Sequence, residues 1–95
     1  MKSDKKQALV ITTAHKGVFF GYGIASDAKT IRLDQCRMCI YWSSETKGVV
    51  GLAADGPQKG SRVSPAAPAM TIQDVTSCME ASEAAVIAWE KGIWQ

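Results

Sequence analysis

Short runs of β-branched and aromatic residues, each ended by a turn signal, fill most of the first half of the chain and constrain its fold most strongly. In one run Ile31 and Leu33 alternate with Arg32 and Asp34, which predicts a strand with one buried face. The chain then continues as an extended, mostly apolar segment. Strands are predicted at residues 7–14, 18–24 and 30–34, with the extended segment at residues 36–42.

Glycine and proline mark places where the strands depart from regular geometry. Gly21 and Gly23 stand inside a strand run, which suggests a bulge, a sharp bend or close backbone approach. Pro65 and Pro68 lack a backbone N–H, so residues 62–70 are expected to form an edge strand or an extended loop.

The second half of the chain contains more turn chemistry. Residues 43–47 read as a polar loop, and residues 48–54 fit either a short strand or one helical turn. Residues 55–61 hold the densest turn signals, and residues 71–80 are expected to form the last strand.

One helix is predicted at residues 83–91. The Ser82 hydroxyl is a suitable N-cap, Val86 and Trp89 share a face, and Gly92 is a natural residue just beyond the end. The predicted fold is therefore α+β and β-rich: a strongly bent antiparallel sheet or partly open small barrel with one short C-terminal helix.

Length and composition favour a single small domain over residues 7–95, preceded by a flexible basic arm at residues 1–6. Hydrophobic residues make up 46% of the 95, and no apolar run approaches the roughly 18 residues of a membrane span. The chain opens with charged residues rather than a signal peptide, so a cytoplasmic location without a membrane partner is expected. The net charge of +2 does not by itself indicate nucleic acid.

The cysteines do not form a recognisable catalytic or metal motif. Cys36 and Cys39 match C-x-x-C, but in a regular strand a spacing of three puts the two side chains on opposite faces. With Cys78 and His15 they number four soft ligands, so zinc is an alternative to simple packing. Nucleophile, dinucleotide and phosphate-loop patterns are absent or incomplete. We therefore expect no enzyme, no cofactor and no metal.

Binding of an anion is a more open question. Residues 56–62 combine two glycines, a hydroxyl and two cations, which can form a concave anion site, although any exposed turn has similar chemistry. Exposed aromatic residues beside arginines suit base stacking or a protein interface. The candidate binding residues are Arg32, Arg37, Tyr41, Trp42, Lys59, Arg62, His15 and Tyr22.

A homo-oligomer is also expected. Adjacent aromatic residues place one ring on each face of a sheet, and a chain this small has a limited core of its own. The candidate interface residues are Phe19, Phe20, Ile93 and Trp94.

Three stretches carry a resemblance to a group of small phage and prophage proteins with an uncharacterised domain. They are residues 15–21 (HKGVFFG), 31–33 (IRL) and 36–42 (CRMCIYW), and the likeness covers roughly residues 8–90. It implies a phage gene expressed in the bacterial cytosol. A weaker similarity is to Sm-like small barrels, but their second, glycine-containing RNA motif is missing and the helix is at the wrong end.

These observations lead to two main functional hypotheses, and an enzyme or metal protein that uses Cys36, Cys39, Cys78 and His15 is a third. The first is a non-enzymatic, phage-encoded accessory protein that binds and inhibits or modulates a host bacterial factor, such as a component of bacterial defence. The alternative is an oligomeric binder of a nucleotide, a nucleic acid or another small anionic ligand.

Overall fold

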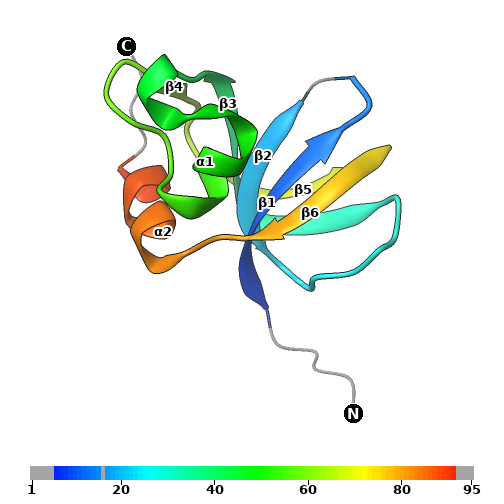
Figure 1. The fold of residues 1–95 in the computed structure, drawn as a ribbon. Coiled ribbons are helices and arrows are strands. Elements are labelled where there is room, and N and C mark those ends of the chain that lie inside the picture. The colour runs from blue at the N-terminus through cyan, green and yellow to red at the C-terminus, as the bar shows by residue number, and fades with distance from the viewer. Residues whose placement is uncertain (1–5, 16, 92–95) are drawn as a thin grey trace.

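Six strands and two α-helices make up the secondary structure of residues 6–15 and 17–91, the part of the chain that the computed structural model describes (Figure 1). A single 3-10 turn, η1 (Ser44–Thr46), precedes the first helix. The strands are β1 (Gln7–Thr13), β2 (Val18–Gly23), β3 (Ile31–Tyr41), β4 (Arg62–Val63), β5 (Ala67–Ile72) and β6 (Val75–Glu80), and the helices are α1 (Gly48–Ala54) and α2 (Glu83–Glu90).

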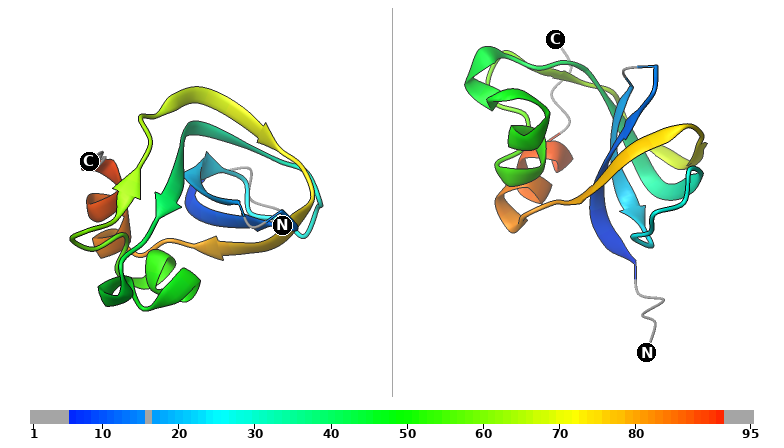
Figure 2. Two further views of the ribbon diagram at one scale, coloured as in Figure 1. Left: turned by 90° about the horizontal axis from the view of Figure 1, so that it is seen from above. Right: turned by 45° about the vertical axis from the view of Figure 1, so that its right-hand side comes forward.

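The strands form one antiparallel sheet in the order β4-β3-β2-β1-β6. β5 also pairs with β3, along its first half, while β4 pairs with the end of β3. Among the described residues β5 pairs only with β3 and β6 pairs only with β1, so the sheet curls without closing (Figure 2). The prediction of a bent, incompletely closed antiparallel sheet is confirmed.

Gly21 and Gly23 allow β3 to lie very close to β2. A Cβ atom at Gly21 would lie 2.8 Å from the Leu33 Cβ, and one at Gly23 would lie 2.5 Å from the Arg32 carbonyl oxygen. Contacts this short exclude any larger residue. The close backbone approach that the sequence suggested is therefore present, and it helps the sheet to curl.

An irregularity in the middle of β3 adds to the bend. Gln35 has a φ of 50°, and the register between β2 and β3 shifts by one residue at this place. Before it, Ile31 and Leu33 are buried as their alternation predicted. Because of the extra residue, Leu33 and Cys36 lie in the same hydrophobic cluster although they are three positions apart.

Two hydrophobic clusters lie on opposite faces of the sheet. The inner cluster draws residues from β5 and β6, the two ends of the sheet, so it lies inside the curl. Its buried members are Leu9, Ile11, Ile31, Leu33, Cys36 and Ile72. The helix-side cluster lies between the sheet and the helices, which occupy one side of the strands in Figure 1. Its buried members are Val10, Val18, Phe20, Cys39, Leu52, Ala53, Val63, Ala85 and Trp89.

Trp89 fixes α2 against the rest of the molecule. Its fully buried ring stacks on Phe20 with a centroid distance of 5.1 Å and an interplanar angle of 9°. Its indole N–H donates to the Leu52 carbonyl oxygen of α1 at 2.9 Å, so the buried polar atom is satisfied. One side chain therefore joins the sheet and both helices.

The predicted C-terminal helix is confirmed, with its cap. The Ser82 hydroxyl accepts a hydrogen bond from the Ala85 N–H at 3.0 Å. α2 ends at Glu90 and is followed by Lys91. The predicted end residue Gly92 lies outside the described residues, as does the predicted arm apart from Lys6, which pairs with Asp34.

Two expectations about the second half of the chain need correction. Residues 48–54 are a helix, so there are two α-helices where one was predicted, and the burial of Leu52 and Ala53 against α2 and the sheet explains this. Residues 71–80 do not form one strand, because the chain turns between β5 and β6 at Gln73 and Asp74, whose φ is 57°.

Candidate functional site

Buried hydroxyl groups tie together the two loops that follow β3 and precede β4. The Ser61 Oγ accepts from the Ser43 N–H at 3.0 Å and lies 3.2 Å from the Thr46 Oγ1. The Thr46 Oγ1 in turn accepts from the Gln58 N–H at 3.1 Å. Thr46 and Ser61 are both almost completely buried. These bonds hold residues 43–47 against residues 58–61, so the surface that the loops form is fixed.

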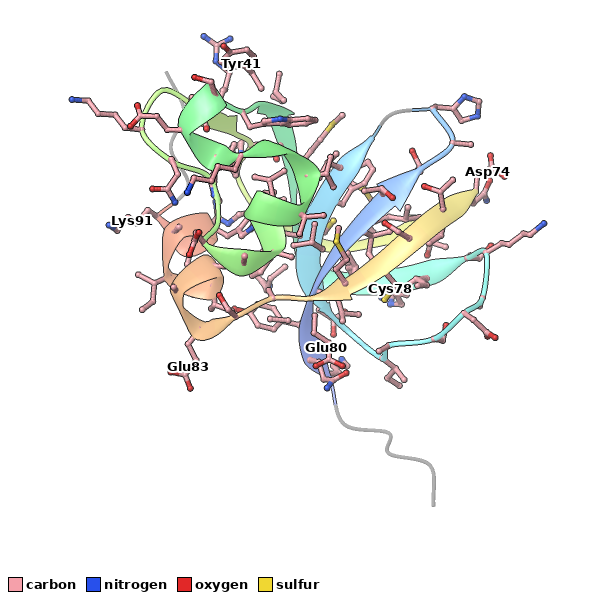
Figure 3. All side chains as sticks on the ribbon, viewed as in Figure 1. Tyr41, Asp74, Cys78, Glu80, Glu83 and Lys91 are labelled. Atoms are coloured by element: carbon pink, nitrogen blue, oxygen red, sulfur yellow. The ribbon has the colours of Figure 1, made fainter. Side chains whose placement is uncertain are left out.

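A hollow of about 460 Å³ opens at this end of the molecule and is lined by Tyr41, Gly60, Ser61 and Arg62. We call it the loop-end hollow. Tyr41 and Arg62 are opposite each other in the β3–β4 register, and both line the hollow. Tyr41 is 60% exposed, and Figure 3 shows it at the top of the view, above the helices.

Two further features lie at or next to the loop-end hollow. Gly60 has a φ of 94°, a conformation that favours glycine, and its neighbour Lys59 is exposed. The Ser43 Oγ is buried and has no hydrogen-bond partner among the described residues. A Cβ atom at Gly60 would lie 3.4 Å from the Ser43 Cβ and 4.0 Å from its Oγ, so this unpaired hydroxyl lies directly beside the glycine.

The structure thus brings together Tyr41, Lys59 and Arg62 from the predicted binding set. Trp42 is next to them in the chain, but its ring is half-buried and packs on the helix-side cluster. Arg37 is also half-buried, and its Nη1 donates to the Ser64 carbonyl oxygen at 3.2 Å.

Arg32, Tyr22 and His15 lie elsewhere. The Arg32 Nε is 3.9 Å from the Asp34 carboxylate, which also pairs with Lys6. Bonding to Lys6 holds the pKa of Asp34 below its usual range. The His15 Nε2 lies 3.5 Å from the Asp74 carboxylate, in an exposed turn.

Tyr22 has a structural contact in this fold. Its hydroxyl donates to the Glu90 carboxylate of α2 at 2.6 Å, and its ring meets Phe20 edge-on at 5.5 Å. Burial, followed by the hydrogen bond and charge of Glu90, raises the pKa of Tyr22 to about 12. The hydroxyl therefore stays protonated at neutral pH and joins the sheet to α2.

The candidate interface residues do not lie together on one surface in the described structure. Phe20 is 1% exposed and belongs to the helix-side cluster, so it is not on the surface that a second chain reaches, and the expectation for it does not fit the structure. The reason is that both faces of β2 are covered. Phe19 is half-buried and packs on the inner cluster. Ile93 and Trp94 lie outside the described residues.

Sequence reasoning missed a group of exposed apolar side chains next to Phe19. Met38 faces Phe19 across the β2–β3 pair, and Ile40 follows two residues later on the same strand. Met70 of β5 lies within 4.0 Å of the Cys36 sulfur, which precedes Met38 by two residues. We call Phe19, Met38, Ile40 and Met70 the apolar strip. Alternation beyond Gln35 was the available signal, but the irregularity there hid which face these residues take.

Cys36 and Cys39 lie on opposite faces of the sheet, as their spacing predicted, because one belongs to the inner cluster and the other to the helix-side cluster. Burial raises the pKa of both thiols to about 11. Cys78 is half-buried at the edge strand β6. Within the described residues, no group of three histidine, cysteine or acidic side chains could hold a metal ion.

Two smaller hollows flank the loop between β2 and β3. One, of about 280 Å³, includes Lys6 and Arg32, but both of these cations already pair with Asp34. The other, of about 310 Å³, lies against β6 and includes Thr76, Ser77 and Cys78. Neither gathers more than one of the predicted binding residues, so the loop-end hollow and the apolar strip are the stronger candidates.

Comparisons with known proteins place the chain at the level of family. None of the described helices is long and apolar enough to cross a membrane. No curated protein and no solved structure matches the sequence. The model of one family, a domain of unknown function designated DUF6948, matches residues 6–89, and with nearly the whole chain covered, the protein belongs to that family.

Proposed function

We propose that this protein is a small, non-enzymatic binding module that acts on a bacterial host protein, as a phage-encoded accessory protein, and that it docks through the apolar strip. The observation that carries the proposal is the exposure of Met38 (38%), Ile40 (48%) and Met70 (36%), with Met38 opposite Phe19 across the β2–β3 pair and Met70 next to Cys36. Adjacent exposed apolar side chains mark interaction surfaces more often than scattered ones do.

The chemistry of the apolar strip suits a protein partner with apolar side chains. Methionine is flexible and polarisable, and it is common on surfaces that adapt to a protein.

Strand addition is a poorer way to bind this surface. β5 contributes Met70 to the apolar strip, and Pro68 of the same strand lacks the N–H that a pairing strand needs. The partner is therefore expected to dock through side chains.

A non-enzymatic role is supported by the thiols. The pKa of both Cys36 and Cys39 is raised to about 11 by burial, so at neutral pH they are neutral and shielded from substrates.

The test compares the wild-type chain with the double variant Met38→Ser/Ile40→Ser. Each is immobilised and exposed to a bacterial lysate, and a protein captured only by the wild type is purified and titrated against both. The expected result is at least about tenfold weaker binding to the double variant. The matched control is Val50→Ser, because Val50 is 70% exposed but lies on α1. Equal loss in the control, or equal binding to the double variant, contradicts the proposal.

Light scattering distinguishes a foreign partner from a second copy. The chain mass is 10.2 kDa. A wild type that is dimeric while the double variant is monomeric would show that another copy occupies the apolar strip, and the host-protein proposal would then be wrong. The expected homo-oligomer stays a prediction until this measurement.

A further inference from the structure

We propose that the loop-end hollow binds the phosphate of a nucleotide whose base stacks on Tyr41. This site is separate from the docking role of the apolar strip and does not depend on it. Its lining combines a cation, an aromatic ring, a buried hydroxyl and a glycine with a φ of 94°. Each of these groups has a place in nucleotide recognition, and here they meet in one hollow.

Tyr41 and Arg62 both line the hollow. The β3–β4 register sets Tyr41 opposite Arg62, and the Tyr41 side chain is 60% exposed, so its ring is available for stacking. Stacking on an exposed aromatic ring is tolerant of the base, because every base has a π-face. Arg62 also lines the hollow, and a guanidinium is complementary in shape and charge to a phosphate group.

The floor of the hollow is fixed. The hydrogen bonds among Ser43, Ser61 and Thr46 hold the loop in place before any ligand arrives. A loop that is already ordered loses little conformational freedom on binding. Gly60 has no side chain, so a phosphate can approach the backbone closely at this position.

An unpaired hydroxyl faces the same glycine. The Ser43 Oγ is buried, has no partner among the described residues and lies beside Gly60. Buried polar atoms without a partner are rare in folded proteins and call for an explanation. The exposed Lys59 adds a second cation at the rim.

Charge on the neighbouring loops limits how strong the site can be. Glu45 and Asp55 are exposed on the adjacent turns, so the field around the hollow is mixed rather than strongly positive. The proposed ligand is thus held by a local contact with Arg62 and Tyr41, and the binding should depend on these two side chains more than on the total charge.

The experiment measures the binding of a fluorescent 12-nucleotide oligothymidine by anisotropy, with ATP as a competitor. Arg62→Gln is expected to weaken binding at least about tenfold and to lower the slope of affinity against salt by about one. Tyr41→Ala is expected to weaken it about tenfold through lost stacking. The matched control is Arg32→Ala, which removes a cation from the other end of β3 and should change affinity less than about twofold.

The outcomes separate the two sources of the nucleotide. Competition by ATP identifies a mononucleotide ligand, whereas binding that ATP does not displace identifies a single-stranded nucleic acid. Both results support the site. Equal losses for Arg32→Ala and Arg62→Gln, or no binding of either probe at 1 mM protein, would overturn it. Circular dichroism of Arg62→Gln confirms folding, and Lys59→Gln, in an exposed loop, serves as the second variant if it does not fold.

Discussion

The three thiols differ in their surroundings, and their reactivity should follow. Cys36 and Cys39 are buried in different clusters, and burial raises the pKa of each to about 11. At pH 8 so high a pKa leaves about one thiol in a thousand as the reactive thiolate. Cys78 is half-buried on an edge strand.

We therefore expect iodoacetamide at pH 8 to modify Cys78 first in the folded protein and to modify all three cysteines in urea. Peptide mass spectrometry after timed quenching measures the order. Modification of Cys36 or Cys39 at the rate of Cys78 in the folded state would contradict the described packing.

Tyr22 predicts how stability changes in alkaline solution. Its pKa is about 12 in the folded state against 10.0 for a free tyrosine side chain, so between these values the folded state binds more protons. The free energy of unfolding therefore falls as the pH rises from about 10 towards 12. Cys36 and Cys39 act in the same direction, from a somewhat lower pH.

The measurement is urea unfolding at several values of pH between 9 and 11.5 for the wild type and Tyr22→Phe. The variant should be less stable at neutral pH, because it loses the bond to Glu90, but its stability should fall less steeply with pH. If the free energy of unfolding of Tyr22→Phe falls with pH as steeply as that of the wild type, the assignment to Tyr22 is wrong.

For single residues, the sequence predicted burial correctly where apolar and polar residues alternate regularly. Ile31 and Leu33 are buried as predicted, and Ser82 caps its helix. Phe20 was misplaced because the usual reading of a sheet assigns one face to solvent, whereas here both faces of β2 are covered.

Among the elements, α2 is the one most dependent on a single polar residue. The Ser82 Oγ accepts from the Ala85 N–H and its hydroxyl also donates to the Ala54 carbonyl oxygen at the end of α1. Ser82→Ala removes both contacts, so we expect it to lower the free energy of unfolding by about 1–2 kcal/mol.

Urea unfolding followed by tryptophan fluorescence measures this change. Ser44→Ala, at the exposed first residue of the 3-10 turn, is the control and should stay within about 0.5 kcal/mol of the wild type. A Ser82→Ala variant as stable as this control would show that the cap and the link to α1 contribute little.

The elements also show where local sequence patterns stop being sufficient. β1, β2, β3 and α2 have strong local signals and are close to their predicted bounds. The helical state of α1 depends on contacts with distant residues, since Leu52 bonds Trp89 through its carbonyl oxygen. The break between β5 and β6 depends on Asp74 adopting a φ of 57°, which the composition of residues 71–80 did not indicate.

Over the whole molecule, the two hydrophobic clusters share the strands β1, β2 and β3. Each cluster covers one face of these strands, so the loss of either cluster would expose a face of the same strands to water. Moreover, β1 pairs with β6 from the far end of the chain, so the ends of the sequence are joined in one sheet. We therefore expect a single cooperative unfolding transition.

The test follows unfolding with one probe in each cluster. Trp89 fluorescence reports the helix-side cluster in a variant whose Trp42 and Trp94 are replaced by phenylalanine, and pulsed thiol labelling of Cys36 reports the inner cluster. The two urea midpoints should agree within error. Separate midpoints would mean that the clusters unfold independently, contrary to a single domain.

Which candidate residues lie together is decided by the pairing of strands across the whole molecule. The binding residues were chosen by type, and only the β3–β4 pairing shows that Tyr41 and Arg62 meet while Arg32 lies at the other end of the same strand. The apolar strip likewise joins β2, β3 and β5, which are separated along the chain. No local pattern contains such information.

The double coverage of β1 also sets how freely this region of the chain can change during evolution. Leu9, Val10 and Ile11 are consecutive and each is fully buried, with Val10 facing the helices and its neighbours facing the interior of the curl. When a library of all single substitutions is scored for the amount of folded protein, substitutions at each of these three positions should be damaging. In β5 exposed and shielded positions are interspersed, so substitutions should again be tolerated at the exposed Pro68 and Thr71. Most strands have an exposed face on which substitutions are nearly neutral. Across these three positions β1 has no such face, so its sequence should change more slowly than that of the other strands.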